Sequence, residues 1–235
     1  MDAANRIPGQ LDGYQCGECL NRGYSHVLDE TGHISVRRCK CMTRRDNERR
    51  IQLSGLSELV SRYTFDNWQI REPWMSKARD LARKYAAERE GWFVAAGSVG
   101  TGKSHLCTAI CVELMESGVD VRYMLWRDVA VQAKAVVNDE EEYSRIVAPL
   151  KKAKCLYIDD FYKTGKGQAP SVGDVNLAFE ILNARYNDKS KLTIISTERS
   201  MEELLDIDEA VGSRIYERSK GHYLDFRGKK NWRLV

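Results

Sequence analysis

The chain has 235 residues, of which 43% are hydrophobic and 30% are charged, and its formal net charge is +3. These values are typical of a globular protein with one medium domain and a small addition. No apolar run approaches the ~18–20 residues of a membrane span, and the first fifteen residues lack the apolar core of a signal peptide. We therefore expect a cytoplasmic protein with no membrane partner. A net charge this small does not by itself indicate nucleic-acid binding, so such a role would depend on local basic patches.

The N-terminal segment is rich in paired cysteines, with C-x-x-C and then C-x-C spacing. It has few large apolar residues, and a segment this small usually needs a disulfide or a bound metal ion to fold. In a reducing compartment, paired cysteines are more often metal ligands than disulfides, and four thiolates suit a tetrahedral Zn²⁺. His26 or His33 is an alternative for one ligand, although both are more typical of polar loop residues. We predict a zinc-binding domain over residues 1–50 with the ligands Cys16, Cys19, Cys39 and Cys41.

A charged segment with helical character follows, and we place a linker helix at residues 51–62. The basic stretch before it, RRCKCMTRRDNERR at residues 37–50, leaves three interpretations open. It contacts a protein partner, it contacts DNA phosphates, or it forms a solvated helix face with internal Glu–Arg pairs.

Short apolar runs then alternate with helical patterns, namely WFVAA, DVRYMLW, CLYIDDF and KLTIIST. This alternation predicts an α/β domain over residues 63–235, built on a largely parallel sheet with helices around it. Three further cysteines fall in apolar stretches and are interpreted as core residues: Cys107, Cys111 and Cys155.

The stretch GSVGTGKS matches G-x-x-x-x-G-K-[ST] and lies between an apolar strand and a helical run. In such a loop, backbone N–H groups and the positive end of the helix surround phosphate oxygens. The lysine reaches the β- and γ-phosphates, and the hydroxyl that follows it binds Mg²⁺. The sequence therefore predicts an ATP and Mg²⁺ site that includes Gly97, Gly102, Lys103 and Ser104.

Two later strands end in polar side chains. CLYIDD ends in two carboxylates, which places Asp159 beside the metal and Asp160 where it can orient or deprotonate the attacking water. KLTIIST ends in two hydroxyls, so Ser196 or Thr197 is a candidate for contact with the γ-phosphate or the water.

Arg214, in AVGSRIYERS, is a candidate to complete the site of a neighbouring subunit. Its guanidinium is always charged, and its planar fork matches phosphate oxygens. On charge alone, a surface arginine paired with Glu217 or Glu209 is the simpler interpretation.

Taken together and in this order, YTFDNW, GSVGTGKSHL, YIDDF, IISTE and GSRIYE resemble the AAA+ family, and more closely the bacterial and phage helicase loaders of the DnaC/DnaI type. The resemblance covers about residues 60–235. It implies an AAA+ P-loop core without a separate C-terminal lid, because little chain follows GSRIYERS. It also implies nucleotide contacts from Gly100 and Thr101, a metal role for Asp159, a base in Asp160, an arginine finger in Arg214, an adenine contact near Phe65 and a sensor in Thr197.

Two departures from the family pattern bear on the chemistry. Asp160 stands where most relatives have Glu, and the shorter side chain moves its carboxylate away from the water. We therefore expect slow hydrolysis that serves as a switch. STE replaces the Ser–Asn that many relatives have at the sensor strand.

The resemblance implies an ATP-dependent loader that binds a DnaB-type replicative helicase and delivers it onto single-stranded DNA. Self-association would occur through the ATPase domain, and the zinc domain would grip the helicase. DNA contacts would come from WRDVAVQAKAVVNDEEEY, with Arg127 and Lys134 on phosphates and Trp126 as a stacking platform, although NDEEE favours a solvated amphipathic helix. The alternatives are a transposition helper ATPase of the IstB type and a small-molecule P-loop kinase, which would have no use for Arg214 in a neighbour.

Overall fold

The structure is a computed structural model that describes residues 2–13, 15–30, 32–53, 57–165 and 167–234. Its main body is a five-stranded sheet in which each strand runs parallel to its neighbours. The strands lie in the order β4 (Val121–Leu125), β5 (Cys155–Phe161), β6 (Leu192–Thr197), β3 (Trp92–Ala96) and β7 (Tyr223–Asp225). The parallel sheet that the sequence predicted is confirmed. The sequence did not reveal β7, because its three residues carry no alternating or continuous apolar pattern.

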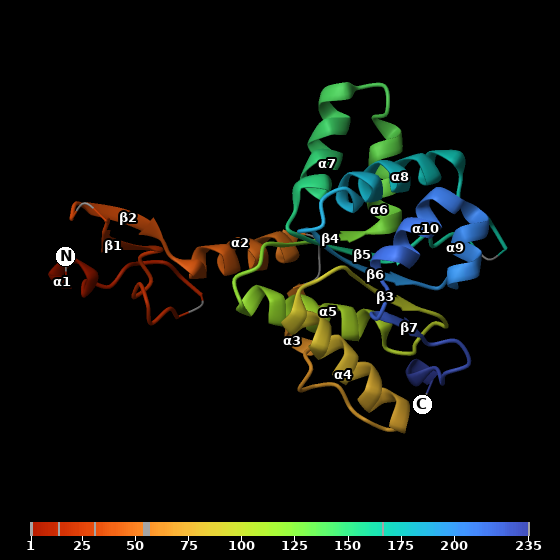
Figure 1. The fold of residues 1–235 in the computed structure, drawn as a ribbon, viewed down its shortest axis with the longest axis horizontal. Coiled ribbons are helices and arrows are strands. Elements are labelled where there is room, and N and C mark those ends of the chain that lie inside the picture. Colours follow the sequence, from red (N-terminus) through yellow and green to blue (C-terminus); the bar gives the residue numbers. More distant parts are fainter. Residues whose placement is uncertain (1, 14, 31, 54–56, 166, 235) are drawn as a thin grey trace.

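The sheet is buried on both faces because helices cover both of them (Figure 1). Side chains alternate along β3, so that Phe93 and Ala95 join one core cluster, whereas Trp92 and Val94 join the other. Strands covered on both sides are continuous apolar runs, as WFVAA is. One face carries α4 (Pro73–Glu88) and α5 (Lys103–Glu116). The other carries α6 (Trp126–Ala135), α7 (Glu140–Lys152), α8 (Val172–Tyr186), α9 (Met201–Ile207) and α10 (Glu209–Arg218).

The cysteine-bearing part lies beside the main body and is joined to it by one helix (Figure 1). It contains α1 (Asp2–Asn5) and an antiparallel hairpin of β1 (Tyr24–Leu28) and β2 (Ile34–Arg38). Helix α2 (Lys40–Leu53) begins among the cysteines and runs through the boundary predicted at residue 50. The buried Asn47 of α2 donates a hydrogen bond to the Val119 carbonyl, which fixes this helix on the core.

The predicted linker at residues 51–62 is divided between the end of α2 and α3 (Ser57–Arg62). Its residues 54–56 lie outside the described part of the chain. No helix among the described residues is long and apolar enough to cross a membrane.

The C-terminal segment returns to the sheet edge after β7 and contains only the short 3₁₀ helix η1 (Trp232–Leu234). Among the described residues, no α-helix follows β7. The backbone N–H of Trp232 donates to the Gly100 carbonyl at 2.8 Å, so this segment lies directly against the glycine-rich loop.

Candidate functional site: a nucleotide cavity and a cysteine cluster

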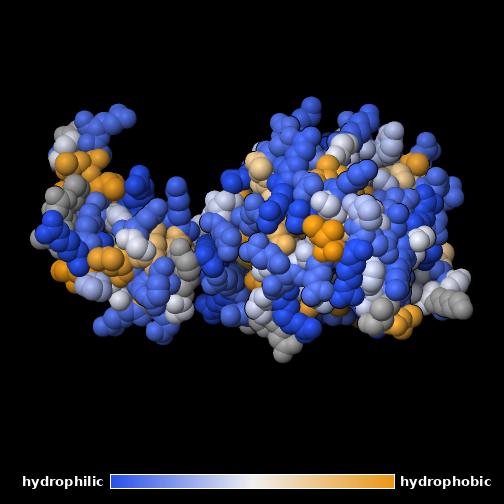
Figure 2. All heavy atoms as spheres, turned by 90° about the horizontal axis from the view of Figure 1, so that it is seen from below, coloured by the Kyte–Doolittle hydropathy of each residue, from blue (hydrophilic) through white to orange (hydrophobic). Residues whose placement is uncertain are grey.

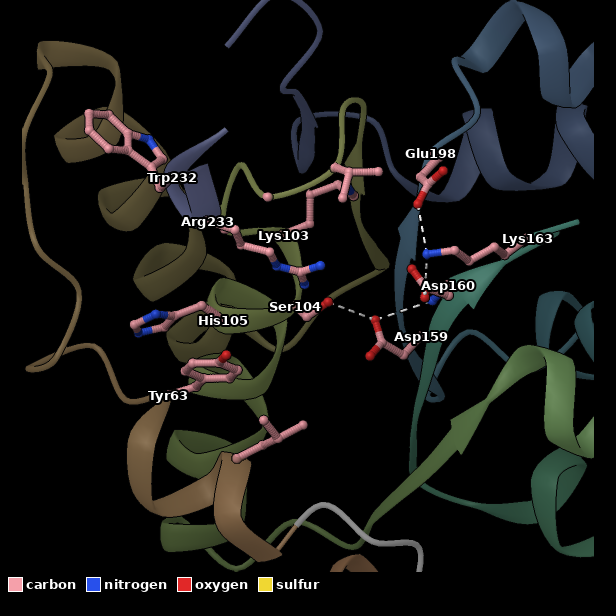
Figure 3. Close-up of a pocket in the computed structure, with 14 residues that line it drawn as sticks. Tyr63, Lys103, Ser104, His105, Asp159, Asp160, Lys163, Glu198, Trp232 and Arg233 are labelled. Carbon is pink, nitrogen blue, oxygen red and sulfur yellow. Dashed lines mark hydrogen bonds and ion pairs between the residues drawn. The ribbon is translucent and has the colours of Figure 1, made fainter. Parts of the chain in front are cut away.

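A cavity of about 320 Å³ lies where β3, β5 and β6 end (Figure 3). Ligands of open α/β sheets bind at the carboxyl ends of parallel strands. The loops that follow these strands lie close together in space, although they are far apart in the sequence. The cavity is lined by Leu59, Tyr63, Val99, Gly100, Gly102, Lys103, Ser104, His105, Asp159, Asp160, Lys163, Glu198, Trp232 and Arg233.

The glycine-rich loop forms one wall of this cavity, and its shape depends on two glycines. Gly102 has φ +99°, and a Cβ there would lie 2.7 Å from the Trp68 ring. Gly100 has φ +73°, and a Cβ there would collide with the Asn231 side chain. Thr101 is fully buried, and its hydroxyl donates to the Ser98 carbonyl at 2.9 Å. The loop is therefore held in a left-handed conformation that leaves its backbone facing the cavity.

Gly97 has a different part in the site. A Cβ at this position would lie 2.6 Å from the backbone nitrogen of Arg227 and 2.6 Å from the carbonyl carbon of Phe226. Gly97 therefore allows the segment after β7 to cross the start of the loop, and it does not line the cavity.

Lys103 provides a buried positive charge at the start of α5. Its residue is 6% exposed, and its Nζ donates to the Ser98 carbonyl at 2.7 Å. Burial lowers the pKa of Lys103, while the nearby Glu198 and Asp160 act against this shift. An ammonium held by a carbonyl at a helix N-terminus fits an anionic ligand, because a phosphate supplies the negative charge that the carbonyl lacks.

Asp159 lies opposite the start of α5 and accepts hydrogen bonds from three hydroxyl groups. Its Oδ1 accepts a hydrogen bond from Ser104 Oγ at 3.1 Å and another from Ser196 Oγ, and Tyr123 donates to Oδ2 at 3.4 Å. Asp159 is 7% exposed. A carboxylate beside a hydroxyl is a set of hard oxygen donors that fits Mg²⁺, so Ser104 and Asp159 would hold the ion.

The placement of the β6 hydroxyls differs from the prediction. Thr197 is fully buried, donates to the Phe161 carbonyl at 2.8 Å and accepts from the Arg199 N–H. It does not line the cavity. Neighbouring side chains on a strand point to opposite sides, so only one of the two hydroxyls reaches Asp159, and that one is Ser196.

Asp160 enters the cavity from an irregular end of β5. The pairing with β6 shifts between Ile158 and Phe161, and Asp160 has φ +52°. Bulges of this kind redirect side chains beside active sites. The Asp160 N–H donates to Ser196 Oγ at 3.0 Å, and its carboxylate contacts Lys163.

Aromatic rings lie at the end of the cavity remote from the carboxylates. Tyr63 stacks on His105 with centroids 4.7 Å apart, and Leu59 lines the same end. A flat apolar surface of this kind suits a purine base. Phe65 itself does not line the cavity, because it is buried in the core under the guanidinium of Arg83, whereas its neighbour Tyr63 does. YTFDNW offers aromatics at positions 63 and 65, and the sequence alone does not show which one faces the ligand.

The C-terminal segment adds two residues that the sequence analysis did not identify. Trp232 and Arg233 line the cavity, and Arg233 points into it toward Lys103 and Ser104 (Figure 3). The Trp232 ring is covered by the Arg71 guanidinium at 5.0 Å. An arginine beside an aromatic in NWRLV was the only signal available, and nothing in the sequence placed that segment next to the P-loop.

Arg214 lies outside the cavity. Its guanidinium donates to Asn183 Oδ1 at 3.1 Å and to the Ala210 carbonyl at 2.7 Å. It also covers the rings of Phe179 and Tyr186. Any phosphate contact by Arg214 therefore has to be made in a neighbouring subunit.

Helix α6 carries the three residues that were candidates for DNA contact, and they lie in different surroundings. Trp126 is 2% exposed and packs on Phe161 and Tyr162, so the idea of a stacking platform is wrong. Lys134 is paired with Asp174 at 2.7 Å. Arg127 is exposed and lines a second cavity of about 260 Å³.

The cysteine cluster brings four buried sulfur atoms within 4.8 Å of one another. The sulfurs of Cys16 and Cys39 are 3.7 Å apart, and those of Cys19 and Cys41 are 3.5 Å apart. Tetrahedral Zn–S bonds of about 2.3 Å require sulfurs about 3.8 Å apart, so the cluster fits Zn²⁺. Burial acts to raise the pKa of Cys19, but hydrogen bonds from the Gly23 N–H and neighbouring thiols lower that pKa to about 7. No histidine belongs to the potential metal-binding groups found among the described residues.

Comparison with known proteins agrees with this geometry. The family model described as "IstB-like ATP binding protein" matches residues 25–222. The chain is 31% identical over 205 residues to the uncharacterized protein YqaM of Bacillus subtilis. The matched region spans 83% of this chain and 64% of YqaM. It is 28% identical to the phage-like element PBSX protein XkdC of the same organism, over 92% of this chain and 83% of XkdC. The replicative helicase loader DnaC of Escherichia coli K12 is 26% identical, over 74% of this chain and 69% of DnaC.

Solved structures show the same fold. The crystal structure of the DnaC helicase loader has a TM-score of 0.62 at 21% identity, and the superposed region spans 71% of this chain and 97% of that one. The structure of DnaI has a TM-score of 0.57 at 18% identity, over 74% and 92% of the two chains. The five-stranded parallel sheet flanked by helices is thus the fold that the DnaC and DnaI structures share with this chain. The chain belongs to the family of IstB-like ATP binding proteins, with DnaC-type helicase loaders among its relatives.

Proposed function

We propose that this protein is an ATP-dependent loader that binds a DnaB-type replicative helicase and delivers it onto single-stranded DNA. ATP binding and slow hydrolysis would act as the switch between holding and releasing the helicase. Similarity to DnaC and the ATP-binding family match support a function in replication or transposition. The zinc module, defined as residues 2–39 together with the start of α2, would be the part that grips the helicase.

The observation that carries this proposal is the position of α5 between the two candidate sites. Its first residue, Lys103, lies in the nucleotide cavity. Its last turn, at Met115 and Glu116, lines a hollow together with Cys16 and Cys41 of the zinc module. One helix therefore runs from the nucleotide cavity to the module that we propose binds the partner. A protein whose grip on a partner depends on ATP needs a connection of this kind, whereas a small-molecule kinase does not.

The residues of the cavity would have different roles in ATP hydrolysis. The P-loop amides, Lys103 and Arg233 would bind the phosphates, and Ser104 and Asp159 would hold Mg²⁺. The bound ion would neutralise developing charge on the phosphates. Asp160 would accept the proton of the attacking water, with Ser196 fixing both carboxylate residues through its hydroxyl.

Arg214 would act between subunits. Two aromatic rings lie under its guanidinium, those of Phe179 and Tyr186, and Phe179 is 38% exposed. A surface with aromatic residues and an arginine has the composition of a protein interface. Self-association through α8 and α10 would bring Arg214 to the γ-phosphate bound by a neighbour, which makes hydrolysis depend on protein concentration. Arg127 remains a candidate for single-stranded DNA, because it is exposed beside the second cavity.

The test is native mass spectrometry of the protein mixed with the replicative helicase of its host, with ATP, with ADP and without nucleotide. We expect a complex of defined stoichiometry whose stability changes with the nucleotide. Deletion of residues 1–50 is expected to abolish this complex and to leave ATP binding intact. A complex that survives the deletion would contradict the role given to the zinc module.

A transposition helper ATPase is the second candidate. The matching family model carries the IstB name, and a putative insertion sequence ATP-binding protein of Sinorhizobium fredii is 32% identical over 124 residues. Absence of a helicase complex in every nucleotide state, together with capture of a transposase, would favour this function over the loader.

A further inference from the structure

Lys163 forms an ion bridge inside the nucleotide cavity that the proposed chemistry does not require. Its Nζ lies 3.0 Å from Asp160 Oδ2 and 2.8 Å from Glu198 Oε1. Figure 3 shows the lysine between the two acids, at the edge of the cavity. Asp160 is the penultimate residue of β5 and Glu198 directly follows β6, so the bridge joins the ends of these two strands.

The local backbone makes this bridge. The Lys163 N–H donates to the Asp160 carbonyl at 3.0 Å, which closes a turn and folds the lysine back over the acid. The left-handed conformation of Asp160, with φ +52°, aims its carboxylate at the same point. Burial acts to lower the pKa of Lys163, but hydrogen bonds to Glu198 and Asp160 raise that pKa, so the lysine stays charged at neutral pH.

A carboxylate that is engaged by an ammonium is a poor general base. The ammonium occupies a lone pair that would otherwise accept the proton of water. We propose that Lys163 is a positioning residue that holds Asp160 back from the attacking water and thereby slows ATP hydrolysis. This inference rests on the proposed function, in which Asp160 is the base.

The bridge is able to open, because Lys163 has space on more than one side. Its side chain is 40% exposed. It lines the second cavity together with Arg127 and Lys134 and a further hollow beside Arg199. Among the described residues, Lys163 is the only one that lines both the nucleotide cavity and the second cavity. A side chain with this freedom fits a reversible clamp better than a fixed structural contact.

The experiment compares steady-state hydrolysis and ATP binding in the wild type, Lys163→Met and Lys163→Arg. We expect Lys163→Met to raise kcat by about tenfold, a change of about 1.4 kcal/mol in the barrier, with the Kd for ATP unchanged. Lys163→Arg keeps the charge and is expected to keep the slow rate.

Lys151→Met is the matched control. Lys151 pairs with Glu180 at 2.8 Å, and the two side chains are 35% and 37% exposed, which resembles the Lys163–Glu198 pair at 40% and 34%. This control removes an equivalent ion pair away from the cavity and should leave kcat unchanged. A Lys163→Met protein that binds ATP but hydrolyses it no faster than the wild type would overturn the inference. Failure of the wild type to bind ATP would contradict the proposed function itself, and failure to bind the helicase would contradict the loader while leaving the clamp supported.

Discussion

The ATPase core and the zinc module hold their structures in different ways. In the core, apolar side chains from both faces of the sheet and from the surrounding helices form two large buried clusters. In the zinc module, the buried cluster consists of Cys16, Cys19, Cys39 and Cys41, with Met42 packed against it. Apolar burial thus stabilises the core through many small contributions, whereas the module depends on four sulfur atoms.

Hydrophobic residues lie at the surface of the zinc module, which is the smaller lobe in Figure 2. On its hairpin, Leu28, Ile34 and Val36 are 57%, 60% and 63% exposed. They lie on one face of the two strands, because Leu28 pairs with Ile34 and Val36 pairs with His26 in the ladder. The exposed apolar residues of this hairpin therefore do not build a core, and we expect a metal ion bound by the cysteines to supply the folding energy. Loss of the metal should consequently affect one region and spare the other.

The largest expected effect is the loss of zinc from the module. Structural zinc contributes roughly 10–16 kcal/mol of apparent folding free energy in small domains, so Cys19→Ser should unfold residues 2–39. Limited proteolysis should then cut this segment, zinc content should fall below one ion per chain, and ATP binding should persist.

Cys155→Ala is the control for that experiment, because Cys155 is fully buried in the core and belongs to no metal cluster among the described residues. It should lower the free energy of unfolding of the core by about 1–2 kcal/mol and retain the zinc. Resistance of the Cys19→Ser module to protease would show that its fold does not depend on the metal.

The core has a polar anchor of its own in Arg185, which is fully buried. Its guanidinium donates to the carbonyls of Leu150, Ala153 and Leu192 and to Thr193 Oγ1. Burial lowers the pKa of Arg185 to about 10, which leaves it charged at neutral pH. Arg185→Met would leave these acceptors unsatisfied, so we expect the free energy of unfolding to fall by about 3–5 kcal/mol.

Chemical denaturation checks this prediction, with Arg145→Met as the control. Arg145 pairs with Glu141 and Glu142 on the surface, where its side chain is 62% exposed, so its loss should change stability by less than about 1 kcal/mol. Equal effects of the two substitutions would contradict the role of Arg185.

The contrast between core and module also separates what the sequence could predict from what it could not. Contiguous motifs predicted the P-loop, the carboxylates of β5 and the cysteine cluster, because each has a fixed local spacing. Contacts made by distant segments were not accessible. The choice of Ser196 over Thr197 depends on which side of β6 faces Asp159, and the position of Trp232 depends on the short strand β7. The burial of Trp126 depends on packing against Phe161, which no local pattern reveals.

The C-terminal segment allows a smaller effect to be measured within the nucleotide site. Trp232 lines the cavity, and its ring, which the substitution to alanine removes, lies under the Arg71 guanidinium. The backbone N–H of Trp232 donates to the Gly100 carbonyl, and alanine retains this hydrogen bond. Trp232→Ala should loosen the segment and weaken ATP binding by about tenfold, or about 1.4 kcal/mol, without unfolding the core. Leu234→Ala is a suitable control, because Leu234 is 82% exposed. Equal affinities in all three proteins, measured by calorimetry, would show that the segment is not part of the nucleotide site.

The smallest expected effect concerns the ion pair between Lys134 and Asp174. The Asp174 carboxylate accepts hydrogen bonds from Lys134 Nζ at 2.7 Å and from Ser171 Oγ at 2.6 Å. Burial acts to raise the pKa of Asp174, but these hydrogen bonds lower that pKa below its usual value. A carboxyl group with a lowered folded pKa stabilises the fold above its unfolded pKa of about 3.9, and this stabilisation disappears as the pH falls through the folded pKa.

Asp174→Asn should therefore lower the free energy of unfolding by about 1 kcal/mol at pH 7, since the lysine is partly exposed. The difference from the wild type should shrink as the pH falls below about 4. Denaturation at several pH values measures it, and the result bears directly on DNA binding. A lysine committed to Asp174 contributes little to phosphate contacts, so Lys134→Glu should then leave single-stranded DNA binding nearly unchanged. If the stability difference is absent at pH 7, the ion pair contributes nothing, and Lys134 is available to phosphates beside Arg127.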